Sequence, residues 1–149
     1  MKSIDILMMS KKNSQIQGIL EQVGYGTTLN QSFNLDFCID GSYVFFATQN
    51  YGVYMYSIDE YGALTYIANH RQGACIYNGV CIANGYLVCA TNLGLVSYSY
   101  NSSGLTYVSL SRYSTTSYYK VTYDGSFLYT SCQQYGVLSY SISALGVFP

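Results

Sequence analysis

The sequence has little charge and few of the side chains on which catalytic and metal sites depend. Only 9% of its 149 residues are charged, against roughly 25% in ordinary soluble domains. The net charge of -1 gives no electrostatic footprint for nucleic acid or for an anionic membrane surface. We therefore expect neither as a partner. With one histidine in the chain, candidates for general-base chemistry are also few.

Long apolar segments are missing as well. No stretch approaches the roughly 18 apolar residues of a membrane-spanning helix. The apolar residues at the N-terminus are interrupted by Asp5 and end at Lys11 and Lys12 before the core of a signal peptide is reached. We expect a chain without an export signal or membrane anchor, in a reduced intracellular compartment.

What the sequence does contain is a repeat. Glycines recur at positions 52, 94 and 136, tyrosines at 56, 98 and 140, and turn glycines at 62, 104 and 146, so each step is 42 residues. A fixed period of this length is typical of repeat architectures. We place the first unit at residues 35–74, the second at 75–117 and an incomplete third at 118–149. Residues 1–34 then form a partial unit.

Each unit is expected to contain strands joined by turns. The pairs Asp40-Gly41, Asn84-Gly85 and Asp124-Gly125 lie between apolar runs, as in tight hairpins. Their Asx residues could form a ring of cation ligands, but the turn itself requires these residue types. The 19 tyrosines suit strands, and no window keeps helical periodicity. The sequence predicts an all-β domain of about three four-stranded antiparallel units.

The five cysteines cannot all pair within the chain, and their separations lack the short paired spacing of a zinc site. We interpret them as small apolar filler. Aligned on the repeat, Cys81 is expected at the position of Phe37 and Val121. We expect no metal and no cofactor.

Residues 124–130, followed by residues 136–142, resemble a β-propeller blade of the lactonase-like and LVIVD-repeat kind. In that family Asp-Gly joins the first two strands, Gly opens the third, and a Gly-ended turn precedes the outer strand. The resemblance implies radially arranged blades, although the WD dipeptide is absent. A β-trefoil and a β-prism, each with internal threefold symmetry, remain alternatives. The first lacks its Gln-x-Trp signature here, and the second lacks the glycine-rich sugar-binding motif of jacalin-like lectins.

The number of units predicts self-association. Propellers have 4–8 blades, whereas this chain holds about three and a half units and its third unit lacks a fourth strand. An open strand edge favours pairing with another chain. Residues 19–23 resemble the outer strand at residues 64–67. We expect strand exchange to complete the third blade of a neighbour, giving a homo-oligomer, with a dimer closing a six-bladed ring.

The candidate binding residues lie in the expected loops. Tyr51 and Tyr135 precede the loop glycines, and in propellers these connections share one end with the blade-to-blade loops that carry His70, Arg71 and Arg112. Such a face would suit a protein or glycan ligand. His70 by itself is expected to be a solvated loop residue.

Three functions remain open at this point. The first is a non-catalytic β-propeller repeat module for protein interaction or for a self-assembling structural role. The second is a lectin-like carbohydrate-binding protein. The third is a hydrolase of the sugar-lactonase type, which depends on the resemblance alone. The sequence shows no catalytic constellation that would favour the third.

Overall fold

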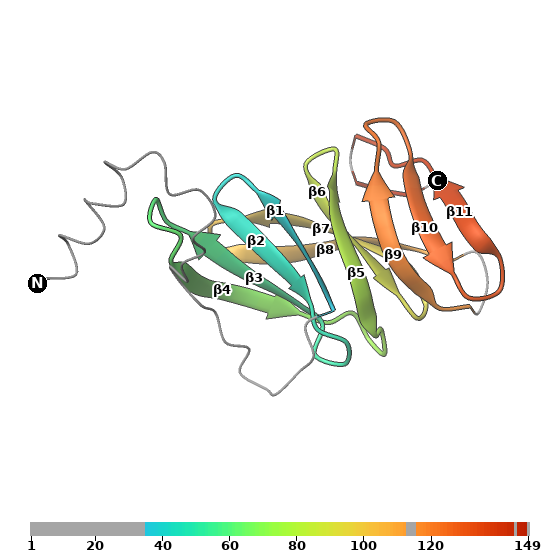
Figure 1. The fold of residues 1–149 in the computed structure, drawn as a ribbon, viewed down its shortest axis with the longest axis horizontal. Helices are drawn as coiled ribbons and strands as arrows, with labels where there is room; N and C mark the ends of the chain where they lie inside the picture. Colours follow the sequence, from blue (N-terminus) through green and yellow to red (C-terminus); the bar gives the residue numbers. More distant parts are fainter. Residues whose placement is uncertain (1–34, 113–115, 145, 149) are drawn as a thin grey trace, which may run out of the picture.

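The computed structural model describes residues 35–112, 116–144 and 146–148. Within them the chain forms eleven strands and no helix. The strands make three antiparallel sheets of four, four and three strands, without a closed barrel (Figure 1). The prediction of an all-β fold is therefore confirmed. The expectation that residues 1–34 form a partial unit supplying a closing strand lies outside the described residues.

Each sheet is a meander in which strands adjacent in sequence pair with one another. The first sheet contains β1 (Asp36–Asp40), β2 (Tyr43–Ala47), β3 (Val53–Ile58) and β4 (Leu64–His70). The second contains β5 (Tyr77–Ala83), β6 (Tyr86–Thr91), β7 (Gly94–Asn101) and β8 (Gly104–Ser111). The third contains β9 (Tyr118–Tyr123), β10 (Leu128–Cys132) and β11 (Gly136–Tyr140).

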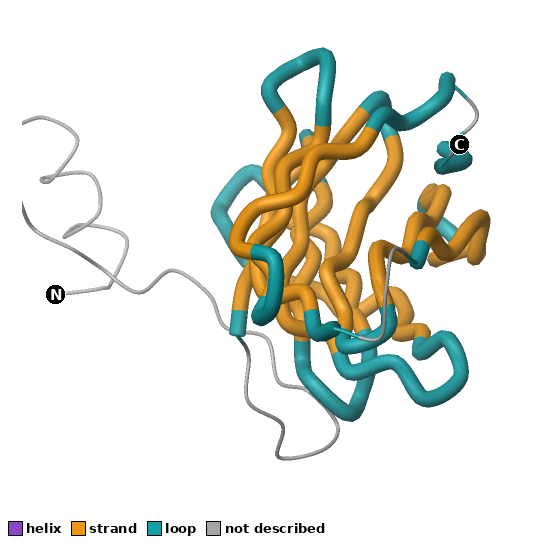
Figure 2. The backbone as a smooth tube through the Cα atoms, turned by 90° about the vertical axis from the view of Figure 1, so that its right-hand side faces the viewer, coloured by secondary structure: helices purple, strands orange, loops and turns teal. Residues whose placement is uncertain are grey.

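The sheets pack on one another through alternate residues of their strands, because successive side chains of a strand point to opposite faces. One buried cluster joins the first and second sheets and includes Phe45, Met55, Leu87 and Tyr98. A second cluster joins the second and third sheets. Full burial of a large apolar side chain contributes about 1.5–3 kcal/mol, so these two layers supply the main apolar stabilisation. Figure 2 shows the strands gathered together, with the loops at their ends.

The Asx-Gly pairs form hairpin turns. Asn84 and Gly85 both have positive φ, 51° and 77°, as a two-residue type I′ turn requires. Asp124 accepts hydrogen bonds at Oδ1 from the backbone N–H groups of Ser126 (2.8 Å) and Phe127 (2.7 Å). The bond from Phe127, then that from Ser126, lowers the pKa of the Asp124 carboxyl. These side chains are engaged in turn formation.

Two of the three recurring loop glycines, Gly52 and Gly94, have a steric cause. At Gly52 a Cβ atom would lie 2.1 Å from the carbonyl oxygen of His70, and at Gly94 it would lie 2.0 Å from that of Ser111. Both glycines also have positive φ, 94° and 137°. The backbone of the β2–β3 and β6–β7 loops therefore approaches the end of the fourth strand too closely for any other residue.

The position predicted for Cys81 is wrong by one residue. Phe37 pairs with Phe46 of β2, and Val121 pairs with Thr130 of β10. The matching row of the second sheet pairs Val80, rather than Cys81, with Cys89. The cause is the placement of the hairpin turn. Asp40 pairs with Tyr43 around Gly41 and Ser42, whereas Ala83 pairs with Tyr86 around Asn84 and Gly85.

The chain after β11 folds back onto the second sheet. Ile142 and Phe148 are buried in the cluster between the second and third sheets. Ser97 Oγ of β7 donates a hydrogen bond to the carbonyl oxygen of Gly146 at 2.6 Å. Within the described residues no fourth strand pairs with β11, so the last turn of the third unit packs as part of the core.

Candidate binding surfaces

The predicted binding residues lie at one end of their sheets, in three separate groups. In an antiparallel meander the loop between the second and third strands lies at the same end as the end of the fourth strand. Tyr51 therefore lies near His70 and Arg71, and a Cβ atom on the intervening Gly52 would be 3.0 Å from Cβ of Arg71. Arg112 follows β8 beside Gly94. Tyr135 belongs to the β10–β11 loop of the third sheet.

These side chains differ in exposure. Tyr51 and Tyr135 are 40% and 50% exposed, and Arg71 and Arg112 are exposed as well. Arg71 Nε also donates a hydrogen bond to the carbonyl oxygen of Cys75 at 3.1 Å. Aromatic and guanidinium groups are thus presented to solvent at this end of the molecule.

His70 does not have the solvated loop position that the sequence suggested. It is the last residue of β4 and is half-buried. Its Nδ1 lies 3.1 Å from the hydroxyl oxygen of Tyr98, and the two rings meet edge to face with centroids 5.2 Å apart. Because Tyr98 belongs to β7, His70 connects the first sheet to the second.

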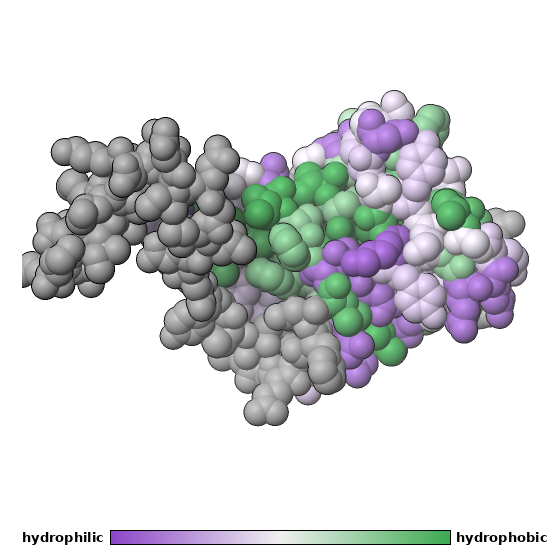
Figure 3. Space-filling model, in the orientation of Figure 1, coloured by the Kyte–Doolittle hydropathy of each residue, from purple (hydrophilic) through white to green (hydrophobic). Residues whose placement is uncertain are grey.

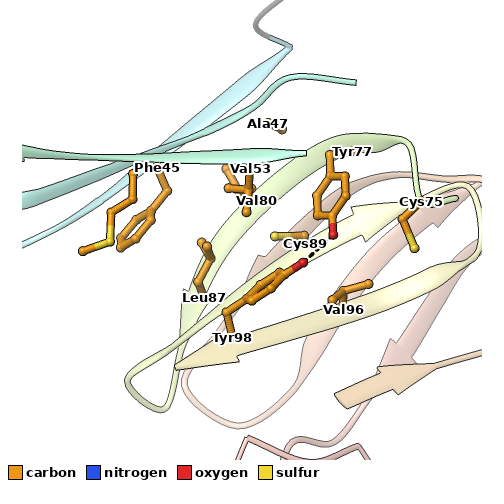
Figure 4. Close-up of a cluster of buried hydrophobic side chains, with 11 residues drawn as sticks. Phe45, Ala47, Val53, Cys75, Tyr77, Val80, Leu87, Cys89, Val96 and Tyr98 are labelled. Carbon is orange, nitrogen blue, oxygen red and sulfur yellow. Dashed lines mark hydrogen bonds between the residues drawn. The ribbon is translucent and has the colours of Figure 1, made fainter. Parts of the chain in front are cut away.

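Tyr98 belongs to a chain of hydrogen bonds that continues into the core. Its hydroxyl is hydrogen-bonded to that of Tyr77 (Figure 4), and Tyr77 Oη accepts from the backbone N–H of Gln72 at 2.8 Å. If Tyr77 donates to Tyr98, and Tyr98 donates to an unprotonated Nδ1 of His70, each hydroxyl donates once. Burial raises the pKa of both tyrosines, so both hydroxyls stay protonated.

This arrangement supports a structural role for His70. A histidine acting as general base is usually oriented by a carboxylate and placed beside a nucleophile, whereas the hydrogen-bond partner of His70 is a tyrosine hydroxyl. Tyr77 was not predicted as a site residue, because it lies outside the tyrosines at 56, 98 and 140 that recur at the 42-residue period. The signal for Tyr98 was its recurrence at the 42-residue period.

A second surface feature is a groove near the first strands of the three sheets. Lys120 of β9 forms an ion pair with Asp36 of β1 at 2.8 Å, and the other oxygen of Asp36 accepts from the backbone N–H of Val80 at 3.1 Å. The groove has a volume of about 510 Å³ and its lining includes Val80, Cys81, Val121, Tyr129 and Val137. Burial, then the carboxylate of Asp36, raises the pKa of the Cys81 thiol to about 12. The groove is therefore apolar along its walls and charged at Asp36 and Lys120.

The third sheet is open where the first two are covered. Val53, Leu95 and Val137 each follow the loop glycine of their unit. The exposed fraction is 0% for Val53 and for Leu95, but 67% for Val137. Equivalent positions thus differ only in whether another sheet packs on them.

The described residues include no group of three or more His, Cys, Asp or Glu side chains that could hold a metal ion. The five thiols are free, and those of Cys75, Cys89 and Cys132 are buried. Over the same part of the chain, no helix has the length and apolar character needed to cross a membrane.

No protein-family model and no curated protein matches this chain. Among solved structures it is similar to the computationally designed Ika4 protein, with a TM-score of 0.45 and 7% sequence identity. The match covers 84% of this chain and 100% of that one. A likeness this weak carries no argument about function. The class that the structure defines is a tyrosine-rich all-β repeat protein of three antiparallel sheets.

Proposed function

We propose that this chain is a β-propeller-type repeat module with a self-assembling structural or protein-interaction role. In this proposal a second copy completes the unfinished third sheet, and the chain carries out no catalytic step. A lone three-sheet arc leaves apolar side chains exposed on β1 and on β11. Association would bury them.

The packing order of the sheets supports the propeller-type arrangement. The first strands of the three units are neighbours, β5 lying beside both β1 and β9 (Figure 1). Each sheet packs face to face on the next one in the sequence. Propellers repeat four-stranded sheets around a central channel in the same way.

The observation that carries the proposal is the open end of the third sheet. β11 pairs with β10 and with no other strand in the described part of the chain. Val137 on that strand is 67% exposed. An unpaired edge offers backbone N–H and C=O groups to a strand from another chain, and an exposed apolar side chain beside it favours association further.

The test is the mass of the full chain in solution. We expect size-exclusion chromatography with light scattering at micromolar concentration to give a multiple of the 16.5 kDa subunit mass. A dimer would agree with a closed ring of two copies, and larger species with an open assembly. A constant mass of 16.5 kDa across a dilution series would overturn the proposal.

Glycan binding is the second candidate, because Tyr51 and Tyr135 are exposed at equivalent loop positions. Tyrosine faces can stack on sugar rings, and arginines beside them can donate to hydroxyl groups. We expect binding on a glycan array to be lost in Tyr51→Ala or Tyr135→Ala, and to persist in Tyr61→Ala, which alters an exposed tyrosine in the β3–β4 turn. An array without signal would exclude this candidate.

A further inference from the structure

We propose that two copies associate head to tail, with the exposed side chains of β1 in the first sheet of one copy packing on the open face of the third sheet of the other. This inference depends on the self-assembly proposed above and names the surfaces involved. The head face consists of Leu35, Phe37 and Ile39, on and beside β1. The tail face consists of Thr122, Tyr129, Ser131 and Val137, on β9, β10 and β11.

The head face contains apolar side chains that are covered in the other two units. Leu35, Phe37 and Ile39 are 41%, 61% and 56% exposed. Hydrophobic surface is visible over β1 and β2 in Figure 3. The corresponding side chains of the other first strands pack against the preceding sheet. They are Tyr77, Val80 and Ile82 in β5 and Tyr118, Val121 and Tyr123 in β9.

The tail face is the exposed face of the third sheet, at the other end of the row of three sheets. Cross-strand pairing places Tyr129 beside Thr122, and Ser131 beside Val137, so these four side chains share one face of the third sheet. The other face, with Leu128 and Thr130, is buried against the second sheet. In the first two sheets the face equivalent to the tail face is covered by the next sheet.

The two interfaces inside the chain indicate which residues should meet between copies. Val53 and Tyr77 belong to the cluster that joins the first and second sheets. Leu95 and Tyr118 belong to the cluster that joins the second and third. By position in the repeat, Val137 of the third unit corresponds to Val53 of the first and Leu95 of the second. In the same way, Leu35 of the first unit corresponds to Tyr77 of the second and Tyr118 of the third. Val137 of one copy should therefore pack near Leu35 of the next.

The groove next to the tail face can receive the rest of the head face. Val137 and Tyr129 line this groove, and its volume of about 510 Å³ leaves room for apolar side chains such as those of Phe37 and Ile39. The hydroxyls of Thr122, Tyr129 and Ser131 make the tail face more polar than the two internal interfaces. Such a composition suits a surface that meets water before assembly, as in non-obligate interfaces.

Head and tail are different surfaces, so the contact is heterologous. Two copies can form two such contacts and close a ring, or each copy can add to the next in an open chain. In either case every junction needs one intact head and one intact tail. This requirement gives a test that separates head-to-tail packing from a symmetric contact.

The experiment uses the full chain and two charge substitutions, one on each face. Phe37→Asp alters the head and Val137→Asp alters the tail. Both sites are more than half exposed, and equal urea midpoints would show that both variants fold. A buried unpaired carboxylate costs several kcal/mol, so we expect each variant alone to associate about 100-fold more weakly than wild type. Tyr61→Asp, in the β3–β4 turn, is the control and should associate as wild type does.

Mixing the two variants is the decisive step. The head variant retains an intact tail face, and the tail variant retains an intact head face. One copy of each can therefore form a single unaltered head-to-tail contact. Light scattering should then show a 1:1 heterodimer that grows no further. Absence of the heterodimer, or association of the single variants at wild-type strength, would overturn the inference while leaving self-assembly standing. A wild-type chain that remains monomeric would instead reject the proposed function together with the inference.

Discussion

Tyr98 shows how a single side chain can join parts of this protein that are distant in sequence. Its ring is buried between the first two sheets, and its hydroxyl meets His70 of β4 on one side and Tyr77 of β5 on the other. A buried hydroxyl is tolerated only when hydrogen-bonded, so each member of the chain depends on the others. The removal of one hydroxyl affects two partners.

We expect Tyr98→Phe to lower the free energy of unfolding by about 1–3 kcal/mol, because Tyr77 and His70 lose a buried hydrogen-bond partner while the ring volume is kept. Urea denaturation followed by circular dichroism measures the change. Tyr61→Phe, at a tyrosine that is 73% exposed, is the matched control and should change stability by less than about 0.5 kcal/mol. Equal losses in the two variants would contradict the assignment.

The half-buried thiol of Cys81 leads to a prediction about alkaline pH. The pKa of Cys81 is raised from 9.0 to about 12 by burial and by Asp36. Below pH 9 the thiol is protonated in both states and has no effect. Between about 9 and 12 only the unfolded thiol ionises, so unfolding releases a proton and stability falls by about 1.4 kcal/mol per pH unit.

Replacement of the thiol should therefore flatten this pH dependence. Urea denaturation of wild type and of Cys81→Ala, measured from about pH 7 to about pH 10, should show a constant offset at the lower end and convergence above about pH 9. Parallel curves throughout would mean that the thiol ionises equally in both states.

At the scale of elements, the repeat keeps its period in some places and loses it in others. Glycines at 52, 94 and 136 retain the 42-residue spacing, and all three have positive φ where the chain enters the third strand of its sheet. The hairpin glycines at 41, 85 and 125 do not. The position of Cys81 was predicted wrongly because the tight turn falls at Gly41 and Ser42 in the first unit but at Asn84 and Gly85 in the second. A one-residue shift moves a side chain to the other face of its strand.

The loop glycines make a prediction at this scale. In Gly94→Ala the new Cβ would lie 2.0 Å from the carbonyl oxygen of Ser111 at a φ of 137°, so the loop must move. We expect a loss of more than about 3 kcal/mol, which is exceptional for one methyl group. Gly41→Ala has positive φ but no atom within 4 Å of the new Cβ, and should lose only about 1–2 kcal/mol. Thermal unfolding of both variants decides this, and equal losses would exclude a steric role for the Gly94 loop.

At the scale of the whole molecule, the segment after β11 contributes Ile142 and Phe148 to the core. Phe148 is buried between the second and third sheets, and Ser97 holds the neighbouring turn through the carbonyl oxygen of Gly146. We expect Phe148→Ala to cost about 3 kcal/mol, through lost burial and the cavity left behind. Val147→Ala, at a side chain that is 43% exposed, should be close to neutral. Calorimetry of the two variants tests this, and a neutral Phe148→Ala would show that the last turn does not stabilise the sheets.

The candidate site was predictable only in part. The sequence placed Tyr51 and Tyr135 in loops, and both are exposed at equivalent positions. It could not place His70, because the partner of His70 is 28 residues further along the chain. Nor could it identify Val137 as exposed, since Val53 and Leu95 have the same local pattern and are fully buried.

The amino-acid sequence by itself determined the strands, the hairpin turns and the all-β class. These depend on a few adjacent residues: alternation sets the two faces of a strand, and Asx-Gly supplies the backbone angles of a tight turn. Only the tertiary structure decided which faces are covered, which tyrosine His70 meets and where the register shifts. Those outcomes depend on the sheet that lies opposite, and that sheet comes from a distant part of the chain.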